Sequence, residues 1–130
     1  MRIMAMAQLS SKRGMNAERL AADFLVTQGL RILCTNYRAR RGEIDVVALE
    51  QSTICFVEVK YRRSNRFGAA VLFVNPQKIR ALSIAATDFL CRNGLNIRSH
   101  DFRFDVLTIE GFAPLTITWY RNAFEMPSDF

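Results

Sequence analysis

The chain has 130 residues, half of them apolar, and its 18 Lys and Arg against 12 Asp and Glu give a net charge of +6. This length fits one domain with a sizeable core, and no apolar run approaches the roughly 20 residues that a membrane span requires. Three widely separated cysteines and a single histidine argue against disulfides, a zinc site or a histidine-dependent nucleophile, and without a secretory signal the cytoplasm is the expected compartment.

The elements expected along the chain alternate between helix and strand. A flexible N-terminal arm over 1–13 precedes a helix over 15–28, a strand over 31–37, and two strands over 44–49 and 54–61. A loop over 62–75 is expected to be mobile without a ligand, and Asn75 and Pro76 predict the start of a helix that ends near Gly94. Strands over 102–109 and 115–120 follow. We expect a single domain over 14–124 and a C-terminal tail over 125–130.

This element order favours an α/β fold. The central strands are apolar on both faces, which is typical of a sheet covered by helices on each side. The sequence therefore predicts a central sheet of about five strands flanked by helices.

The strands over 44–49 and 54–61 carry charges where apolar residues are expected. They read as a hairpin, in which paired residues have numbers that sum to the same value as Glu50 and Thr53. That register places Asp45 opposite Glu58, and Lys60 lies on the same face two residues beyond. Two carboxylates this close repel one another unless a cation lies between them.

This arrangement is typical of a divalent-metal site. Carboxylate oxygens suit Mg²⁺ or Mn²⁺, a metal-bound water is a usable nucleophile near neutral pH, and Lys60 could orient that water or steady negative charge. Glu18, on the edge of the first helix, could complete the metal shell directly or through a water. The competing interpretation is ordinary: Asp45 with Lys60, or Glu58 with Arg62, as ion pairs on a half-exposed sheet, and Glu18 as a solvated helix residue.

The excess positive charge belongs to the first half of the chain. Residues 1–66 hold 12 Lys or Arg and 6 Asp or Glu, whereas residues 67–130 hold 6 of each. A basic surface attracts polyanions, of which nucleic acid is the commonest in cells, although a merely soluble basic surface also accounts for it. The basic residues expected to contact a nucleic-acid backbone, or to be solvated, are Arg40, Arg41, Arg62, Arg63, Arg66 and Lys78.

Five segments carry a resemblance to a known family. They are GMNAERLA from Gly14, GEIDVVA from Gly42, FVEVKYR from Phe56, NPQKIRAL from Asn75 and RFDV from Arg103. Together they resemble the YraN-like family of small bacterial proteins. That family is similar to Holliday-junction resolvases and to the wider PD-(D/E)xK, or restriction-endonuclease-like, superfamily. The resemblance extends from Gly14 to Phe124 and implies a restriction-endonuclease-like α/β core with a mixed sheet.

The resemblance also implies roles for individual residues. By motif position, Asp45, Glu58 and Lys60 match the catalytic acids and lysine, Glu18 matches a helix-borne acid, and the backbone carbonyl of Val59 is implied as a further metal ligand. We therefore expect a Mg²⁺-dependent endonuclease or resolvase-like enzyme that hydrolyses DNA phosphodiesters. Resolvase relatives act as dimers, which leaves a homodimer open.

Two other functions compete with the nuclease interpretation. One is a nucleic-acid-binding or scaffold protein that keeps the fold without turnover. The other is a protein-interaction module with no nucleic-acid role. Salt-sensitive DNA binding that survives loss of both carboxylates would favour the first, and absence of DNA binding at low salt would favour the second.

Overall fold

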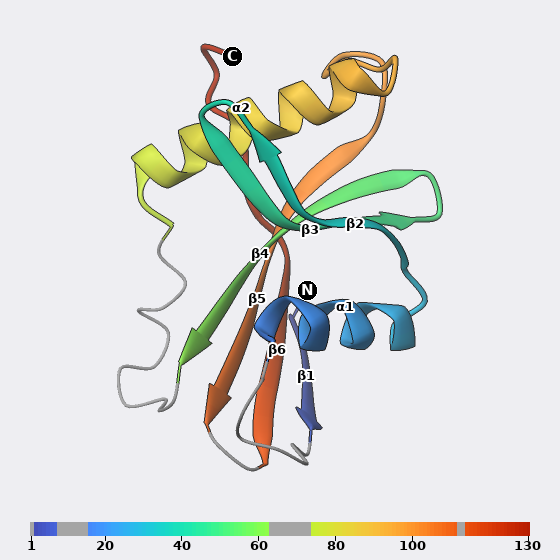
Figure 1. The fold of residues 1–130 in the computed structure, drawn as a ribbon, viewed down its shortest axis with the longest axis vertical. Helices are drawn as coiled ribbons and strands as arrows, with labels where there is room; N and C mark the ends of the chain where they lie inside the picture. The colour runs from blue at the N-terminus through green and yellow to red at the C-terminus, as the bar shows by residue number, and fades with distance from the viewer. Residues whose placement is uncertain (1, 8–15, 63–73, 112–113) are drawn as a thin grey trace.

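A computed structural model describes residues 2–7, 16–62, 74–111 and 114–130 of the chain, with residues 2–7 described by their backbone. Within these ranges it contains one sheet and two helices (Figure 1). The strands are β1 (Arg2–Ala7), β2 (Arg31–Ala39), β3 (Gly42–Glu50), β4 (Thr53–Arg62), β5 (Phe102–Gly111) and β6 (Leu115–Phe124). The helices are α1 (Ala17–Thr27) and α2 (Pro76–Arg92).

The sheet is mixed and has the strand order β1-β6-β5-β4-β3-β2. β4 and β5 run parallel, and every other neighbouring pair is antiparallel. The parallel pair is joined through α2, as a parallel connection requires. The expected α/β fold with a mixed, helix-flanked sheet is therefore confirmed, and the sheet has one strand more than the five predicted.

The additional strand corrects one prediction. Residues 2–7 were expected to belong to a flexible arm, but they form β1, which pairs with β6 from Arg2–Tyr120 to Ala7–Leu115. The partner lies more than a hundred residues away, and the pairing uses backbone groups. Local side-chain periodicity therefore gives no sign of such a strand.

The helices begin and end where the sequence predicted, within about two residues. Asn16 caps α1 by accepting a hydrogen bond from the Arg19 backbone N–H, and Asn75 caps α2 in the same way with Lys78 at 2.8 Å. Pro76 occupies the first helical turn, where no backbone donor is needed. Gly29, which follows α1, has φ +94°, a conformation that glycine adopts without strain.

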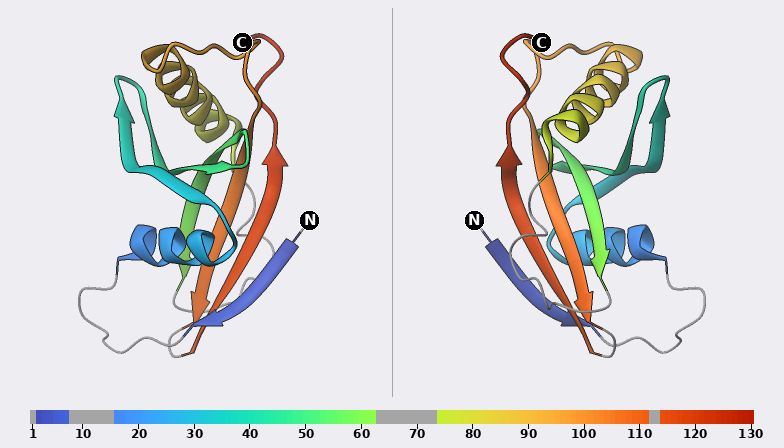
Figure 2. Two further views of the ribbon diagram at one scale, coloured as in Figure 1. Left: turned by 90° about the vertical axis from the view of Figure 1, so that its right-hand side faces the viewer. Right: turned by 90° about the vertical axis from the view of Figure 1, so that its left-hand side faces the viewer.

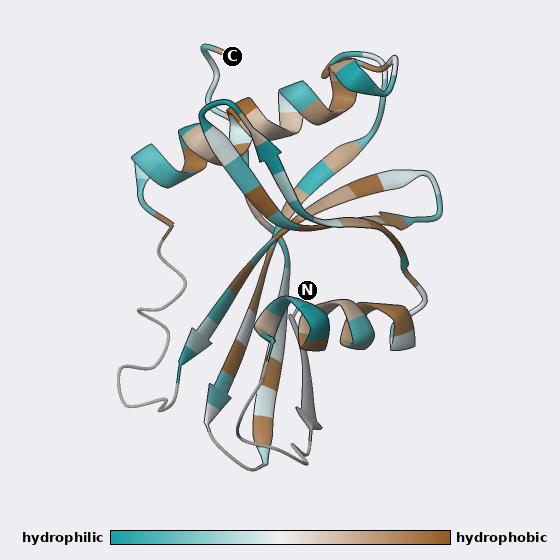
Figure 3. Ribbon diagram, in the orientation of Figure 1, coloured by the Kyte–Doolittle hydropathy of each residue, from teal (hydrophilic) through white to brown (hydrophobic). Residues whose placement is uncertain are grey.

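The two helices cover different faces of the sheet. α1 packs Ala21, Phe24 and Leu25 into a core that includes Val57 of β4. α2 packs its apolar face into a second core with Phe56. In Figure 2, α2 lies on one side of the sheet region formed by β2 and β3, and α1 lies on the other. The strands between the helices are mostly apolar, as Figure 3 shows. Helices on both faces explain why the central strands lack apolar–polar alternation.

β3 bends at Asp45, and this bend shapes the candidate site. Ile44 belongs to the core beneath α2, whereas Val46 belongs to the core beside α1, although residues two apart in a regular strand share a face. The pairing of β2 with β3 passes from Thr35–Val46 to Tyr37–Ile44, and Asn36 between them has φ +52°. The β2–β3 hairpin thus changes direction at Asp45 and turns towards α2 (Figure 1).

Gly42 allows α2 to approach this hairpin closely. A Cβ atom at position 42 would lie 2.2 Å from the backbone oxygen of Ala81 in α2, which is far closer than any real contact. The helix therefore packs against the first residue of β3 through the space that the missing side chain leaves. This contact fixes the beginning of α2 relative to Asp45, three residues along the strand.

Candidate active site

The hairpin has the register that the sequence predicted. β3 pairs with β4 from Glu50–Thr53 to Val46–Val57, and the two residue numbers of each pair add up to the same value. The pairing stops one pair short of Asp45 and Glu58, because β3 bends away at this point. Asp45 then uses its side chain: its Oδ2 accepts a hydrogen bond from the backbone N–H of Val59 at 2.8 Å. The carboxylate thus accepts a hydrogen bond from a backbone N–H of β4 that would otherwise lose its partner where β3 bends away.

Glu58 is buried beside Asp45, which is itself half-buried. The relative exposure of Glu58 is 6%. The pKa of Glu58 is raised to about 7, mainly by burial and also by the charge of Asp45 and a hydrogen bond between the two carboxyl groups. Nearby Lys78 and Lys60 oppose this shift. Two acids that cannot both ionise comfortably form a ready site for a cation.

Two lysines accompany the carboxylates. Lys60 lies two residues beyond Glu58 on β4, on the face that α2 covers, and its charge acts on Glu58. Lys78 comes from the first turn of α2, and its Nζ lies 3.5 Å from Oε2 of Glu58. The sequence predicted Lys78 as a nucleic-acid contact and gave no sign of its proximity to Glu58. No local pattern could have shown it, because the two residues are twenty positions apart in the chain.

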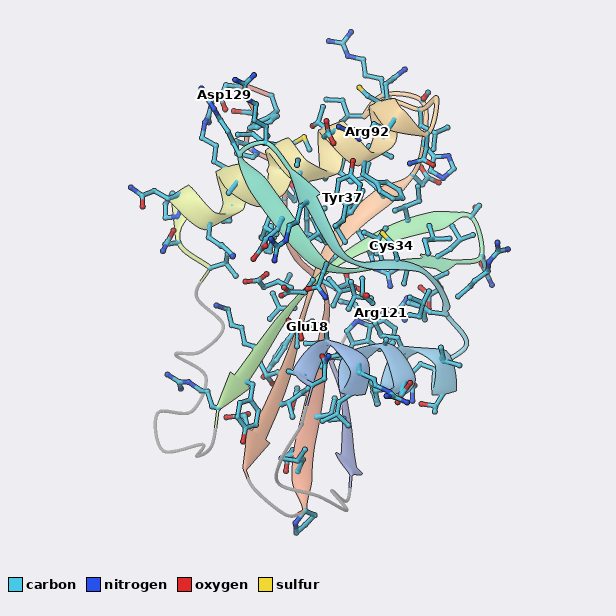
Figure 4. All side chains as sticks on the ribbon, viewed as in Figure 1. Glu18, Cys34, Tyr37, Arg92, Arg121 and Asp129 are labelled. Carbon is cyan, nitrogen blue, oxygen red and sulfur yellow. The ribbon has the colours of Figure 1, made fainter. Side chains whose placement is uncertain are left out.

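Glu18 is not brought into this group. It lies half-buried in the first turn of α1 (Figure 4), and α1 packs against the face that carries Val57 and Val59 rather than the face of Glu58. In the described parts of the chain, no three His, Cys, Asp or Glu side chains converge to hold a metal. A role for Glu18 through a bridging water, and the Val59 carbonyl as a ligand, remain predictions.

The predicted basic contacts are distributed as follows. Arg40 and Arg41 form the exposed turn between β2 and β3. Arg62 ends β4 and is half-buried. Arg63, Arg66 and the mobile loop predicted around them lie outside the described residues. A pocket of about 290 Å³ opens between the β2–β3 turn and α2, and it is lined by Arg38, Ala39, Gly42, Glu43, Lys78 and Ala81.

A second charged cluster has a structural role. Asp105 is fully buried in β5 and accepts hydrogen bonds from Arg103 Nε, from Trp119 Nε1 and from the backbone N–H of Asn122. Arg103 also pairs with Glu50 at 2.8 Å. These bonds surround the irregularity in the pairing of β5 with β6 between Phe104 and Val106. The RFDV segment therefore shapes the sheet instead of contributing to the site.

Comparison with known proteins identifies relatives of this chain. A sequence model described as "Uncharacterised protein family UPF0102" matches residues 17–109. A UPF0102 protein of Chromohalobacter salexigens is 43% identical over 117 residues, covering 89% of this chain and 93% of that protein. One of Klebsiella pneumoniae is 42% identical over 117 residues, covering 90% and 89%. In the described residues no helix is long and apolar enough to cross a membrane.

Proposed function

The chain belongs to the uncharacterised protein family UPF0102, the YraN family whose motifs the sequence resembles, and we propose that it is a Mg²⁺- or Mn²⁺-dependent endonuclease, of the resolvase-like kind, that hydrolyses DNA phosphodiesters. One observation carries the proposal: Asp45 and the buried Glu58 lie side by side at a bend in the sheet, with lysines on the same face. A purely structural ion pair would need only Glu58 and Lys78, which lie 3.5 Å apart. The second carboxyl group, that of Asp45, disfavours the ionised form of Glu58 and is the feature that an ion pair leaves unexplained.

The two carboxylates fit a hard divalent cation. Mg²⁺ commonly uses one or two carboxylates and completes its shell with waters and substrate phosphate oxygens, so a third protein carboxylate is not required. Asp45 and Glu58 would hold it. When bound, it would lower the pKa of a coordinated water and stabilise charge on the phosphate.

The remaining residues have separate tasks in this proposal. Lys60 steadies the negative charge that develops on the phosphate oxygens. The backbone N–H of Val59 holds the Asp45 carboxylate in position through its 2.8 Å hydrogen bond. Arg40 and Arg41, exposed on the hairpin turn, contact the DNA backbone and carry no sequence preference.

The test is a cleavage assay on branched, single-stranded and duplex DNA with Mg²⁺ or Mn²⁺. Asp45→Asn and Glu58→Gln keep the shapes of the side chains and remove the charges, so each is expected to lower the rate by about 100-fold or more. Asp23→Asn is the matched control, because it removes one exposed carboxylate from α1 away from the site. Wild-type protein that cleaves no substrate faster than the two site variants would refute the proposal.

A second function is a DNA-binding or scaffold protein without turnover. The observation that favours it is that no third acidic ligand joins Asp45 and Glu58 in the described residues. It predicts salt-sensitive DNA binding that persists in Asp45→Asn and Glu58→Gln, together with no Mn²⁺ binding by calorimetry.

A further inference from the structure

Lys78 contacts the candidate site and also lines the neighbouring pocket. Its Nζ lies 3.5 Å from Glu58 Oε2, and its side chain also lines the pocket between the β2–β3 turn and α2, which Arg38 lines from the other side. The Lys78 side chain is 39% exposed, whereas that of Glu58 is 8% exposed. The ammonium therefore lies between the buried Glu58 and an open pocket in which Arg38 pairs with Glu43 at 3.7 Å.

The backbone of Lys78 is held by the start of α2, whereas its side chain is partly exposed. Its N–H donates to the capping Asn75 Oδ1 at 2.8 Å, and α2 is pressed against β3 at Gly42 and Ala81. The four-carbon stem of lysine has several rotatable bonds, so the ammonium can change partner without movement of the helix.

The charges of the site explain why a change of partner is expected. Asp45 and Glu58 are matched in number by Lys60 and Lys78 when both acids are ionised. A divalent cation between the carboxylates leaves two positive charges in excess, and the ammonium of Lys78 is then repelled from its position beside Glu58. The pocket offers the ammonium another position, where a phosphodiester group with one negative charge would lower this excess from two to one.

We propose that Lys78 pairs with Glu58 in the free protein and moves to a phosphate of the DNA strand in the pocket when the carboxylates hold a divalent cation. The inference rests on the proposed function and names the subsite that receives the substrate. Arg38, which lines the same pocket, contacts the same phosphate or the next one.

The test uses Lys78→Met, with Lys78→Arg as the variant that keeps the charge and Arg80→Met as the control. Arg80 lies on the same helix but pairs with Asp129 at 3.0 Å. Its guanidinium also lies over the ring of Phe130, and Arg80 is not among the residues that line the pocket. Figure 2 shows α2 between the β2–β3 turn and the C-terminal tail. Two measurements are made with full-length protein: Mn²⁺ binding by calorimetry without DNA, and DNA binding with Ca²⁺ replacing Mg²⁺.

We expect Lys78→Met to bind Mn²⁺ at least as tightly as wild type, because a repelling charge is gone. Its affinity for DNA in Ca²⁺ should fall about tenfold, and the slope of log K against log salt should fall by about one. Lys78→Arg should recover most of the DNA affinity, and Arg80→Met should match wild type in both measurements.

Two results would overturn the inference. Loss of Mn²⁺ binding in Lys78→Met would show that the lysine only organises the carboxylates, and unchanged DNA affinity would show that it does not reach a phosphate. Either can occur in a protein that cleaves DNA, so the nuclease proposal would survive. Conversely, cation- and Lys78-dependent DNA binding without cleavage by wild type would refute the nuclease proposal and support this one.

Discussion

Glu58 is the least exposed charged residue of the site, at 6%. Burial and the neighbouring Asp45 both disfavour its ionised form, and Lys78 only partly compensates them. The native state therefore binds the Glu58 proton more tightly than the unfolded chain does. A residue of this kind lowers stability at neutral pH, which is the usual sign that a position serves a function.

The first prediction concerns stability against pH. With a pKa of about 7 in the folded state and 4.5 as its ordinary value, Glu58 holds a proton in the native state between these values while the unfolded chain has released it. The free energy of unfolding therefore decreases as pH rises through this window, by roughly 3 kcal/mol in total. Below about pH 4.5, Glu58 contributes no pH dependence to the free energy of unfolding.

Glu58→Gln removes this titration. Urea unfolding of both proteins without metal should show the variant gaining stability relative to wild type between about pH 4.5 and pH 8. Saturating Mn²⁺ should then raise the stability of wild type at about pH 8 and leave the variant nearly unchanged. A constant difference between the proteins at every pH would contradict the assignment.

The β2–β3 hairpin and α2 form a single unit around the site. The hairpin carries Asp45 and α2 carries Lys78, and the contact of Gly42 with the Ala81 backbone oxygen sets the distance between them. Tyr37 of β2 adds a second contact by donating a hydrogen bond from its hydroxyl to Asp88 of α2 at 2.5 Å. The GEID segment therefore carries both a packing residue and a candidate ligand.

The second prediction tests this packing. Gly42→Ala places a Cβ where the Ala81 oxygen lies, so α2 must shift, and we expect a loss of about 1–3 kcal/mol in unfolding free energy. Because this shift also moves Lys78, DNA affinity in Ca²⁺ should fall, as we expect for Lys78→Met. Gly94→Ala is the control, because Gly94 has φ +75° but no atom within 4 Å of an added Cβ. That variant should lose about 1–2 kcal/mol from backbone strain alone and keep its DNA affinity.

At the scale of the whole molecule, basic residues lie at both ends of α2. Arg40 and Arg41 occupy the hairpin turn beside the pocket, whereas Arg92 ends α2 at the other end (Figure 4) and Arg98 follows it. All four are exposed. If DNA binding depended on net charge alone, the two pairs of arginines would contribute equally. Because only Arg40 and Arg41 lie beside the pocket, we expect them to contribute more.

The third prediction separates these two sets. Arg40→Ala with Arg41→Ala should weaken binding to duplex DNA and lower the slope of log K against log salt by about two, because two phosphate contacts are lost. Arg92→Ala with Arg98→Ala changes the net charge equally and should leave the slope nearly unchanged. Equal slopes for the two double variants would show that the protein binds DNA through its charge alone.

Local patterns in the sequence determined the hairpin register, the helix caps and the helix-covered sheet. A side-chain period of two and a short loop permit one pairing that keeps the apolar residues inside, and Asn75 with Pro76 supplies a cap from adjacent residues. The tertiary structure alone decided β1, the bend at Asp45 and the approach of Lys78 to Glu58. Each depends on a contact between segments far apart in the chain, which no periodicity within either segment records.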